Sequence, residues 1–169
     1  MTIQAGDRIP DATLNTIRDG AVQAVSTDDV FGDRKVVLFA VPGAFTPTCS
    51  AKHLPGYVEQ FDAFRARGVD VACVSVNDAF VMDAWAKSQS APDDLVMLAD
   101  GNGEFPRALG LELDATAFGM GLRAKRFALY AEDGVVKSVF VEAPGEFRVS
   151  SAEHVLERIP GSANAGGVS

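Results

Sequence analysis

The stretch Val36-Val37-Leu38-Phe39-Ala40-Val41-Pro42-Gly43 decides the fold class of this chain. The run from Val36 to Val41 is continuously apolar and rich in valine, which is typical of a short strand buried on both faces. It ends at Pro42-Gly43, because proline lacks the N–H that a strand ladder needs and glycine favours a turn. Strands buried on both faces belong mainly to parallel sheets covered by helices, so this run predicts an α/β domain.

The elements that follow this strand alternate between helix and strand. Apolar residues spaced by three or four from Leu54 to Phe64 predict a helix that ends near Gly68. Further expected elements are strands over 69–76, 95–99, 126–131 and 135–141, and helices after Asn77-Asp78 and over 104–109 and 151–159. Glu132-Asp133-Gly134 predicts a hairpin turn between the last two strands. This order predicts a thioredoxin-like α/β sandwich, with a central mixed β-sheet flanked by helices and an N-terminal extension.

Length and composition bound the class of protein. The 169 residues suit a single domain over 1–160, and the small-residue segment 161–169 is expected to be a flexible tail. The net charge of −8 argues against a nucleic-acid or anionic-membrane partner. No apolar run approaches the roughly 20 residues that span a bilayer, and no secretory signal is recognised, so a cytoplasmic location is expected. Two cysteines cannot form a disulfide framework, which draws attention to their reactivity.

The segment between the first strand and the helix that follows it is the expected functional site. In open α/β sheets, ligands bind beyond the carboxyl ends of the strands. Cys49 falls near the N-terminus of the helix, where free backbone N–H groups and the helix dipole favour a thiolate. A free cysteine is often a buried hydrophobe, but the polar neighbours and the two prolines of this loop, Pro42 and Pro47, do not resemble a core face.

The spacing Thr46-x-x-Cys49 separates this site from the C-x-x-C motif of disulfide oxidoreductases. A hydroxyl in place of the first sulfur prevents a local disulfide and places a donor and acceptor one helical turn from the thiol. Such a pair suits the attack of sulfur on the O–O bond of a peroxide, which yields a cysteine sulfenic acid.

Pro42, Thr46 and Cys49 together form the pattern Pro-x-x-x-Thr-x-x-Cys, which resembles the active-site signature of peroxiredoxins. Longer stretches resemble the type II, or peroxiredoxin-five-like, branch. They run from Val41 to Ser50, His53 to Tyr57, Ser75 to Phe80, Leu98 to Asp100 and Arg123 to Ala128, and so extend over nearly the whole chain.

The resemblance implies a thioredoxin-like fold, a homodimer and a thiol peroxidase that reduces hydrogen peroxide and small alkyl hydroperoxides. It implies that Pro42, Thr46, Cys49 and an arginine surround the peroxide. Alignment with the family identifies that arginine as Arg126, with Arg123 as the alternative. No cofactor or metal is implied. A guanidinium there would favour the thiolate and hold peroxide oxygens.

The source of electrons is the least determined part of this interpretation. Some five-like relatives carry a further cysteine that resolves the sulfenic acid, but the corresponding stretch 145–151 has none. Cys73 lies in a strand expected to be buried on both faces, where a thiol is desolvated and a poor nucleophile, so it is not expected to resolve Cys49. The resemblance therefore favours an external thiol, either glutathione with glutaredoxin or thioredoxin.

Other residues and other functions are weaker hypotheses. His53 could share a helix face with Cys49 as a base, although a surface or interface histidine is the more ordinary interpretation. Phe45, Phe80 and Trp85 could line a dimer face but are more often core residues. No four-ligand metal spacing is present, and the Gly-x-Gly pairs at 101–103 and 119–121 are interpreted as turns. A disulfide oxidoreductase or redox chaperone and a non-enzymatic binding module remain as alternatives on the same fold.

Overall fold

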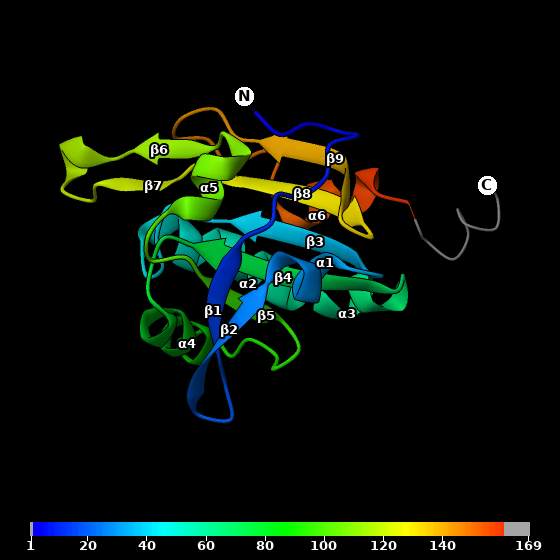
Figure 1. The fold of residues 1–169 in the computed structure, drawn as a ribbon, viewed down its shortest axis with the longest axis horizontal. Coiled ribbons are helices and arrows are strands. Elements are labelled where there is room, and N and C mark those ends of the chain that lie inside the picture. The colour runs from blue at the N-terminus through cyan, green and yellow to red at the C-terminus, as the bar shows by residue number, and fades with distance from the viewer. Residues whose placement is uncertain (1, 161–169) are drawn as a thin grey trace.

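A seven-stranded mixed sheet forms the centre of the computed structural model, which describes residues 2–160 (Figure 1). The strand order is β2-β1-β5-β4-β3-β8-β9, in which β3, β4 and β5 are mutually parallel and the remaining pairs are antiparallel. The strands are β1 (Thr13–Arg18), β2 (Ala21–Ser26), β3 (Lys35–Ala40), β4 (Val69–Ser75), β5 (Val96–Ala99), β8 (Phe127–Glu132) and β9 (Val135–Val141). A separate two-stranded sheet joins β6 (Glu112–Asp114) to β7 (Leu122–Ala124).

Helices cover both faces of the large sheet. They are α1 (Thr27–Phe31), the π-helical turn η1 (Cys49–His53), α2 (Leu54–Glu59), α3 (Phe61–Ala66), α4 (Ala79–Ser88), α5 (Glu104–Leu109), the short 3₁₀ turn η2 (Thr116–Phe118) and α6 (Ala152–Arg158). One core packs α2, α3, α4 and α6 against the sheet, and the other packs α1 and α5 against the opposite face. The predicted thioredoxin-like sandwich is confirmed.

Strand β3 contributes side chains to both cores, as its continuous apolar run predicts. Val37 and Phe39 belong to the core under α2, α3, α4 and α6, while Val36, Leu38 and Ala40 belong to the core under α1 and α5. All five side chains are essentially covered. Alternation of successive side chains between the two faces of a strand explains why each position along β3 is apolar.

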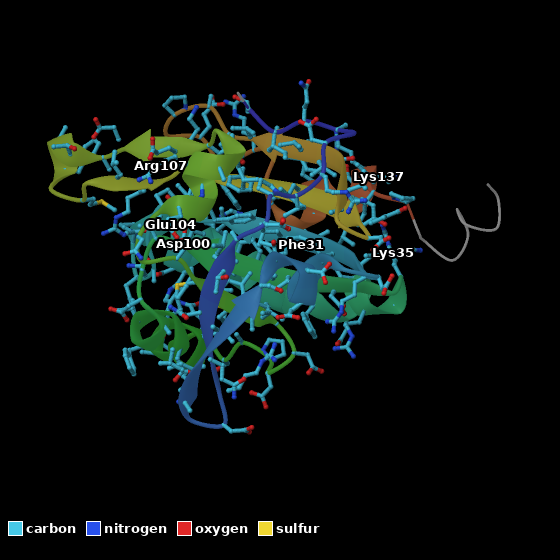
Figure 2. The ribbon with its side chains drawn as sticks, viewed as in Figure 1. Phe31, Lys35, Asp100, Glu104, Arg107 and Lys137 are labelled. Carbon is cyan, nitrogen blue, oxygen red and sulfur yellow. The ribbon has the colours of Figure 1, made fainter. Side chains whose placement is uncertain are left out.

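The parallel strands set the direction of the sheet, and hence the edge where a site is expected. Lys35 begins β3 and Asp100 follows β5, and the two residues mark opposite ends of the sheet in Figure 2. Asp100 accepts a hydrogen bond from the Phe105 backbone N–H at 2.8 Å and so anchors the start of α5. The loop from Pro42 to Thr48 emerges at the carboxyl end of β3.

The N-terminal extension forms a hairpin of β1 and β2 that the apolar pattern of the sequence does not predict. Asp19 and Gly20 link β1 to β2 with positive φ angles of 53° and 78°. An Asp-Gly pair is a strong signal for this type of two-residue hairpin turn. The strand β2 is largely exposed, so it lacks the apolar pattern by which the other strands were found.

The helix expected from Leu54 to Gly68 is interrupted. Gln60, with φ −95° and ψ 7°, separates α2 from α3. Its apolar stripe nevertheless faces the sheet, since Leu54, Tyr57 and Phe64 are fully buried. The other strands and helices predicted after Pro42 are present within a few residues of their expected bounds. The expected flexible tail, 161–169, lies outside the described residues, and none of the described helices is long and apolar enough to cross a membrane.

Candidate active site

The loop that follows β3 is held in shape by its own backbone and by a neighbouring strand end. The Thr46 hydroxyl donates to the Gly43 carbonyl at 2.6 Å, and the Ala44 N–H donates to Asn77 Oδ1 at 3.0 Å. Phe45 lies in the left-handed region with a φ of 64°, which only a constrained loop imposes on an aromatic residue. These contacts fix the loop conformation and place Thr46 just before the next helix.

Gly43 allows this loop to approach the segment that carries Arg123. A Cβ added at Gly43 would lie 3.0 Å from Arg123 Nη1 and 3.2 Å from Thr46 Cγ2. Both distances are shorter than ordinary van der Waals contacts. A side chain at this position would push Thr46 or Arg123 away from the carboxyl edge of the sheet.

Cys49 lies in the first turn of the helix, as predicted, and the turn is wider than an α-helix. The Ser50 N–H donates to the Thr46 carbonyl, while the Leu54 N–H reaches the Cys49 carbonyl five residues back. π-Helical turns of this kind are rare and often occur at functional sites. The Trp85 indole N–H donates to the Ser50 hydroxyl at 3.0 Å and ties this turn to α4. Cys49 itself is completely covered by its neighbours.

Arg126 is the charged side chain that contacts the Cys49 sulfur. Its Nη2 donates to Cys49 Sγ at 3.2 Å. The register of the sheet explains this position, because Phe127 at the start of β8 pairs with Ala40 at the end of β3. Arg126 therefore lies at the carboxyl edge of the sheet, level with the beginning of the active-site loop. The contact places a cation with several N–H donors directly against the sulfur.

Arg123, the alternative arginine, lies at the same edge but contacts backbone oxygens. Its Nε donates to the Met120 carbonyl at 2.9 Å and its Nη1 to the Pro42 carbonyl at 3.3 Å. The structure thus brings three predicted site residues, Pro42, Thr46 and Cys49, to one loop and first turn. It places Arg126 against the sulfur and Arg123 against the loop backbone.

His53 lies in the interior, and the interpretation of it as a surface or interface residue is wrong. It is fully buried, and its Nδ1 lies 2.9 Å from Arg126 Nη1 while its Nε2 lies 3.1 Å from the Ser150 carbonyl. Burial, together with the charge of Arg126, lowers the pKa of His53 to about 3, so the imidazole is neutral at physiological pH. The helical spacing from Cys49 did not reveal that a distant loop closes over this histidine.

That distant loop, 142–150, is a part of the site that sequence reasoning missed. The Glu142 carboxylate accepts hydrogen bonds from the backbone N–H groups of Arg148, Val149 and Ser150 and from the Ser150 hydroxyl. Burial raises the pKa of Glu142, but these hydrogen bonds outweigh it and leave the pKa below its usual value. Phe147 packs on the other side, with its ring 5.0 Å from the His53 ring and 5.9 Å from the Arg126 guanidinium carbon. No local motif marks these residues.

Cys73 lies in the middle of β4, between Phe39 of β3 and Met97 of β5 in the register. It is completely buried and belongs to the same core as Cys49. Burial raises the pKa of its thiol well above the usual value, and the charge of an ionised Cys49 would raise it further. Both cysteines are free thiols, and the expectation that Cys73 is a poor nucleophile agrees with this environment.

Comparisons with known proteins agree with this geometry. A family model described as Redoxin matches residues 4–156. The chain is 52% identical to "Peroxiredoxin-2E-2, chloroplastic" of Oryza sativa subsp. japonica, over 94% of this chain and 73% of that protein. It is 45% identical to "Peroxiredoxin-2B" of Arabidopsis thaliana, over 93% of this chain and 98% of that protein. The solved structure of reduced Prx3 in complex with H₂O₂ from Vibrio vulnificus superposes with a TM-score of 0.88 at 50% identity, covering 92% of this chain and 98% of the other.

Proposed function

The chain belongs to the peroxiredoxins of the redoxin family, and from this membership we propose that Cys49 is the thiol through which it reduces peroxides. The protein is a thiol-dependent peroxidase, as its relatives and the peroxide-bound neighbour indicate. The contact between Arg126 Nη2 and Cys49 Sγ carries the assignment of Cys49, because it places a fixed cation against one of the two thiols.

In the first step, the Cys49 thiolate attacks one oxygen of the peroxide. A sulfur–oxygen bond forms, the O–O bond breaks, and the leaving oxygen takes a proton to become water or an alcohol. Arg126 stabilises the thiolate and the charge that moves onto the oxygens. Thr46 supplies a hydroxyl one turn before the sulfur, and Pro42 shapes the loop without adding an N–H that would compete for the thiolate.

In the second step, an external thiol attacks the sulfenic acid sulfur, water leaves, and a mixed disulfide forms. A second thiol then releases Cys49 and carries away the disulfide. We propose glutathione with glutaredoxin as this reductant, with thioredoxin as the alternative, because no cysteine lies in the 145–151 stretch. Cys49 is fully covered, so a thiol as large as glutathione reaches its sulfur only after the first helical turn opens. The reducing environment that such thiols need favours a cytoplasmic location.

A homodimer is the proposed assembly, supported by exposed aromatic side chains beside the site. Phe45, Phe80 and Phe118 are 55%, 69% and 81% exposed, whereas Trp85 is fully buried. The bond from the Ala44 N–H to Asn77 connects the loop that carries Phe45 to the turn just before α4, the helix that carries Phe80. Met120, two residues after Phe118, lies 3.4 Å from the position that a Cβ on Gly43 would take. Sedimentation of the reduced protein tests this assembly, and a monomer alone at micromolar concentration would refute it.

The peroxidase assignment is tested by single-turnover reaction of the reduced protein with hydrogen peroxide. Peroxide should disappear in proportion to Cys49, and mass spectrometry should find one added oxygen atom on the peptide that contains Cys49. When glutathione is present, the same peptide should carry glutathione instead. Consumption of peroxide with no modification at Cys49 would contradict the proposal.

A further inference from the structure

We propose that His53 is a positioning residue that holds the Arg126 guanidinium against the Cys49 sulfur, acting as a neutral hydrogen-bond acceptor. This inference rests on the proposed function, because it assigns Arg126 and Cys49 to the reacting pair. It adds a residue outside the Pro42, Thr46, Cys49 and Arg126 set and gives the loop 142–150 a part in the chemistry.

The chemistry of the partners decides the tautomer of His53. Arg126 has only donors, so the Nδ1 atom that faces it at 2.9 Å must be unprotonated and must accept. The Ser150 carbonyl only accepts, so the Nε2 atom that faces it at 3.1 Å must carry the hydrogen. Arg126 therefore donates one hydrogen bond to His53 through Nη1 and one to Cys49 through Nη2. A planar guanidinium held at two of its nitrogens cannot turn away from the sulfur without losing a bond.

The same contacts exclude the role that the spacing of Cys49 and His53 first indicates. A general base needs a nitrogen lone pair directed at the proton that it removes. The lone pair of His53 is occupied by Arg126, and its other nitrogen is a donor to Ser150. His53 therefore acts on Cys49 through Arg126 and not by proton transfer.

Packing fixes the imidazole plane as firmly as its hydrogen bonds. The His53 ring lies 4.9 Å from the Phe39 ring, 5.7 Å from the Tyr57 ring and 5.0 Å from the Phe147 ring. These rings come from the strand before the site, from the helix after it and from the distant loop. The imidazole is surrounded on several sides, so the direction of its Nδ1 lone pair is set by the fold.

The loop that receives the Nε2 hydrogen bond is itself tied to Arg126. Glu142 gathers the Ser150 N–H and hydroxyl on one carboxylate oxygen, at 2.8 Å and 2.7 Å. The backbone N–H of Glu142 donates to the Arg126 carbonyl at 3.0 Å. One closed chain of hydrogen bonds thus runs from Arg126 through His53, Ser150 and Glu142 back to Arg126. This arrangement orients His53 in the way that outer partners orient a group that touches the reacting atoms.

A matched pair of substitutions tests the roles of the two imidazole nitrogens of His53 separately. In His53→Asn, the amide oxygen can take the place of Nδ1 and accept from Arg126, while the contact with Ser150 is lost. In His53→Gln, the amide nitrogen can reach the place of Nε2 and donate to Ser150, while no acceptor remains at the Nδ1 position. Tyr57→Phe is the control, because the Tyr57 hydroxyl donates to the same Ser150 carbonyl at 2.8 Å and does not contact Arg126.

We expect His53→Gln to slow single-turnover reaction with hydrogen peroxide by about 10- to 100-fold, by analogy with the loss seen when a residue that orients a metal ligand is removed. The pH at which iodoacetamide labels Cys49 should move upward in the same variant. His53→Asn should retain most of the rate and the labelling profile of the parent protein. Tyr57→Phe should lower the melting temperature without moving the profile.

Equal loss in the Asn and Gln variants with an unmoved labelling profile would overturn the proposal, since only a structural role would remain. Imidazole ¹⁵N chemical shifts of the unmodified protein provide a test that needs no variant at position 53. They should show a neutral Nε2–H tautomer, with the signal of His154 identified by His154→Gln. An Nδ1–H tautomer would also overturn the proposal. Labelling of Cys49 by iodoacetamide does not require peroxide turnover. Failure of the peroxidase assignment would therefore be recognised separately, by the absence of an added oxygen atom on Cys49 after the parent protein is treated with peroxide.

Discussion

Cys49 and Cys73 are both completely buried, both free and both part of one core, yet their surroundings differ. Cys49 lies at the start of a helix with the Arg126 guanidinium 3.2 Å from its sulfur. Cys73 lies in the centre of β4 among apolar neighbours, and burial raises the pKa of its thiol. Burial alone therefore does not decide the reactivity of a cysteine. A cation donates directly to the Cys49 sulfur, whereas for Cys73 burial outweighs the more distant charge of Arg126 and leaves the pKa of its thiol raised.

The largest expected effect on peroxidase turnover comes from removing the Cys49 sulfur, which contacts Arg126. Cys49→Ser should abolish peroxidase turnover and leave the fold intact, because serine is nearly isosteric but its hydroxyl is not a thiolate. Turnover with hydrogen peroxide and circular dichroism of the same preparation check this outcome. Retained turnover in the folded variant would show that Cys49 is not the cysteine that reacts with peroxide.

Removing the cation while keeping the sulfur should give the next largest effect. Arg126→Ala should slow single-turnover reaction with peroxide by about 10²-fold or more, as loss of one preorganised donor typically does. Arg123→Ala is the matched control at the same edge of the sheet, since Arg123 contacts backbone carbonyls and not the sulfur. If Arg123→Ala loses most of the single-turnover rate and Arg126→Ala keeps it, the assignment of the arginine is wrong.

The hydroxyl of Thr46 allows a finer test of what distinguishes the Cys49 environment. Thr46→Val keeps the shape of the side chain but removes the donor and acceptor and the bond to the Gly43 carbonyl. One hydrogen bond of about 1 kcal/mol corresponds to a loss of roughly tenfold or less in rate, smaller than the loss of the cation. Stopped-flow kinetics with peroxide should place this variant between the parent protein and Arg126→Ala. A rate equal to that of the parent would remove Thr46 from the proposed site.

The smallest effect on activity is expected at the other cysteine. Cys73→Ser should keep turnover supported by glutathione or glutaredoxin, although a hydroxyl in an apolar strand should cost about 1–3 kcal/mol of stability. Because burial raises the pKa of Cys73, its thiol stays protonated at neutral pH. Iodoacetamide should therefore label Cys49, each time its helical turn opens, and leave Cys73 unlabelled in the otherwise folded protein. Labelling of Cys73 should require strongly alkaline pH or unfolding.

Mass spectrometry of the peroxide-treated protein can contradict the prediction that Cys73 takes no part in turnover. A dominant disulfide between Cys49 and Cys73, together with loss of turnover in Cys73→Ser, would mean that the two thiols act as a pair. Such a bond needs the two Cα atoms within roughly 7 Å of each other.

Much of the fold could be predicted because its signals are local. The run Val36–Val41, its stop at Pro42-Gly43 and the alternation of helix and strand are read from consecutive residues, and each reappears in the structure. The hairpin of β1 and β2 was missed because β2 is exposed and has no apolar alternation. The break at Gln60 was missed because the apolar stripe on either side of it continues in register.

The sequence by itself determined the part of the candidate site that is close in the chain. Pro42, Thr46 and Cys49 lie within one loop and one helical turn, so their proximity follows from chain geometry. Resemblance to the family already named Arg126, with Arg123 as the alternative, but the contact with the sulfur is set by tertiary structure, since β8 pairs with β3 in a register that puts Phe127 opposite Ala40. The burial of His53 was decided in the same way, because its partners Arg126 and Ser150 are 73 and 97 residues distant. Contacts over such separations depend on how strands pair and loops close, and no local spacing in the sequence encodes that register.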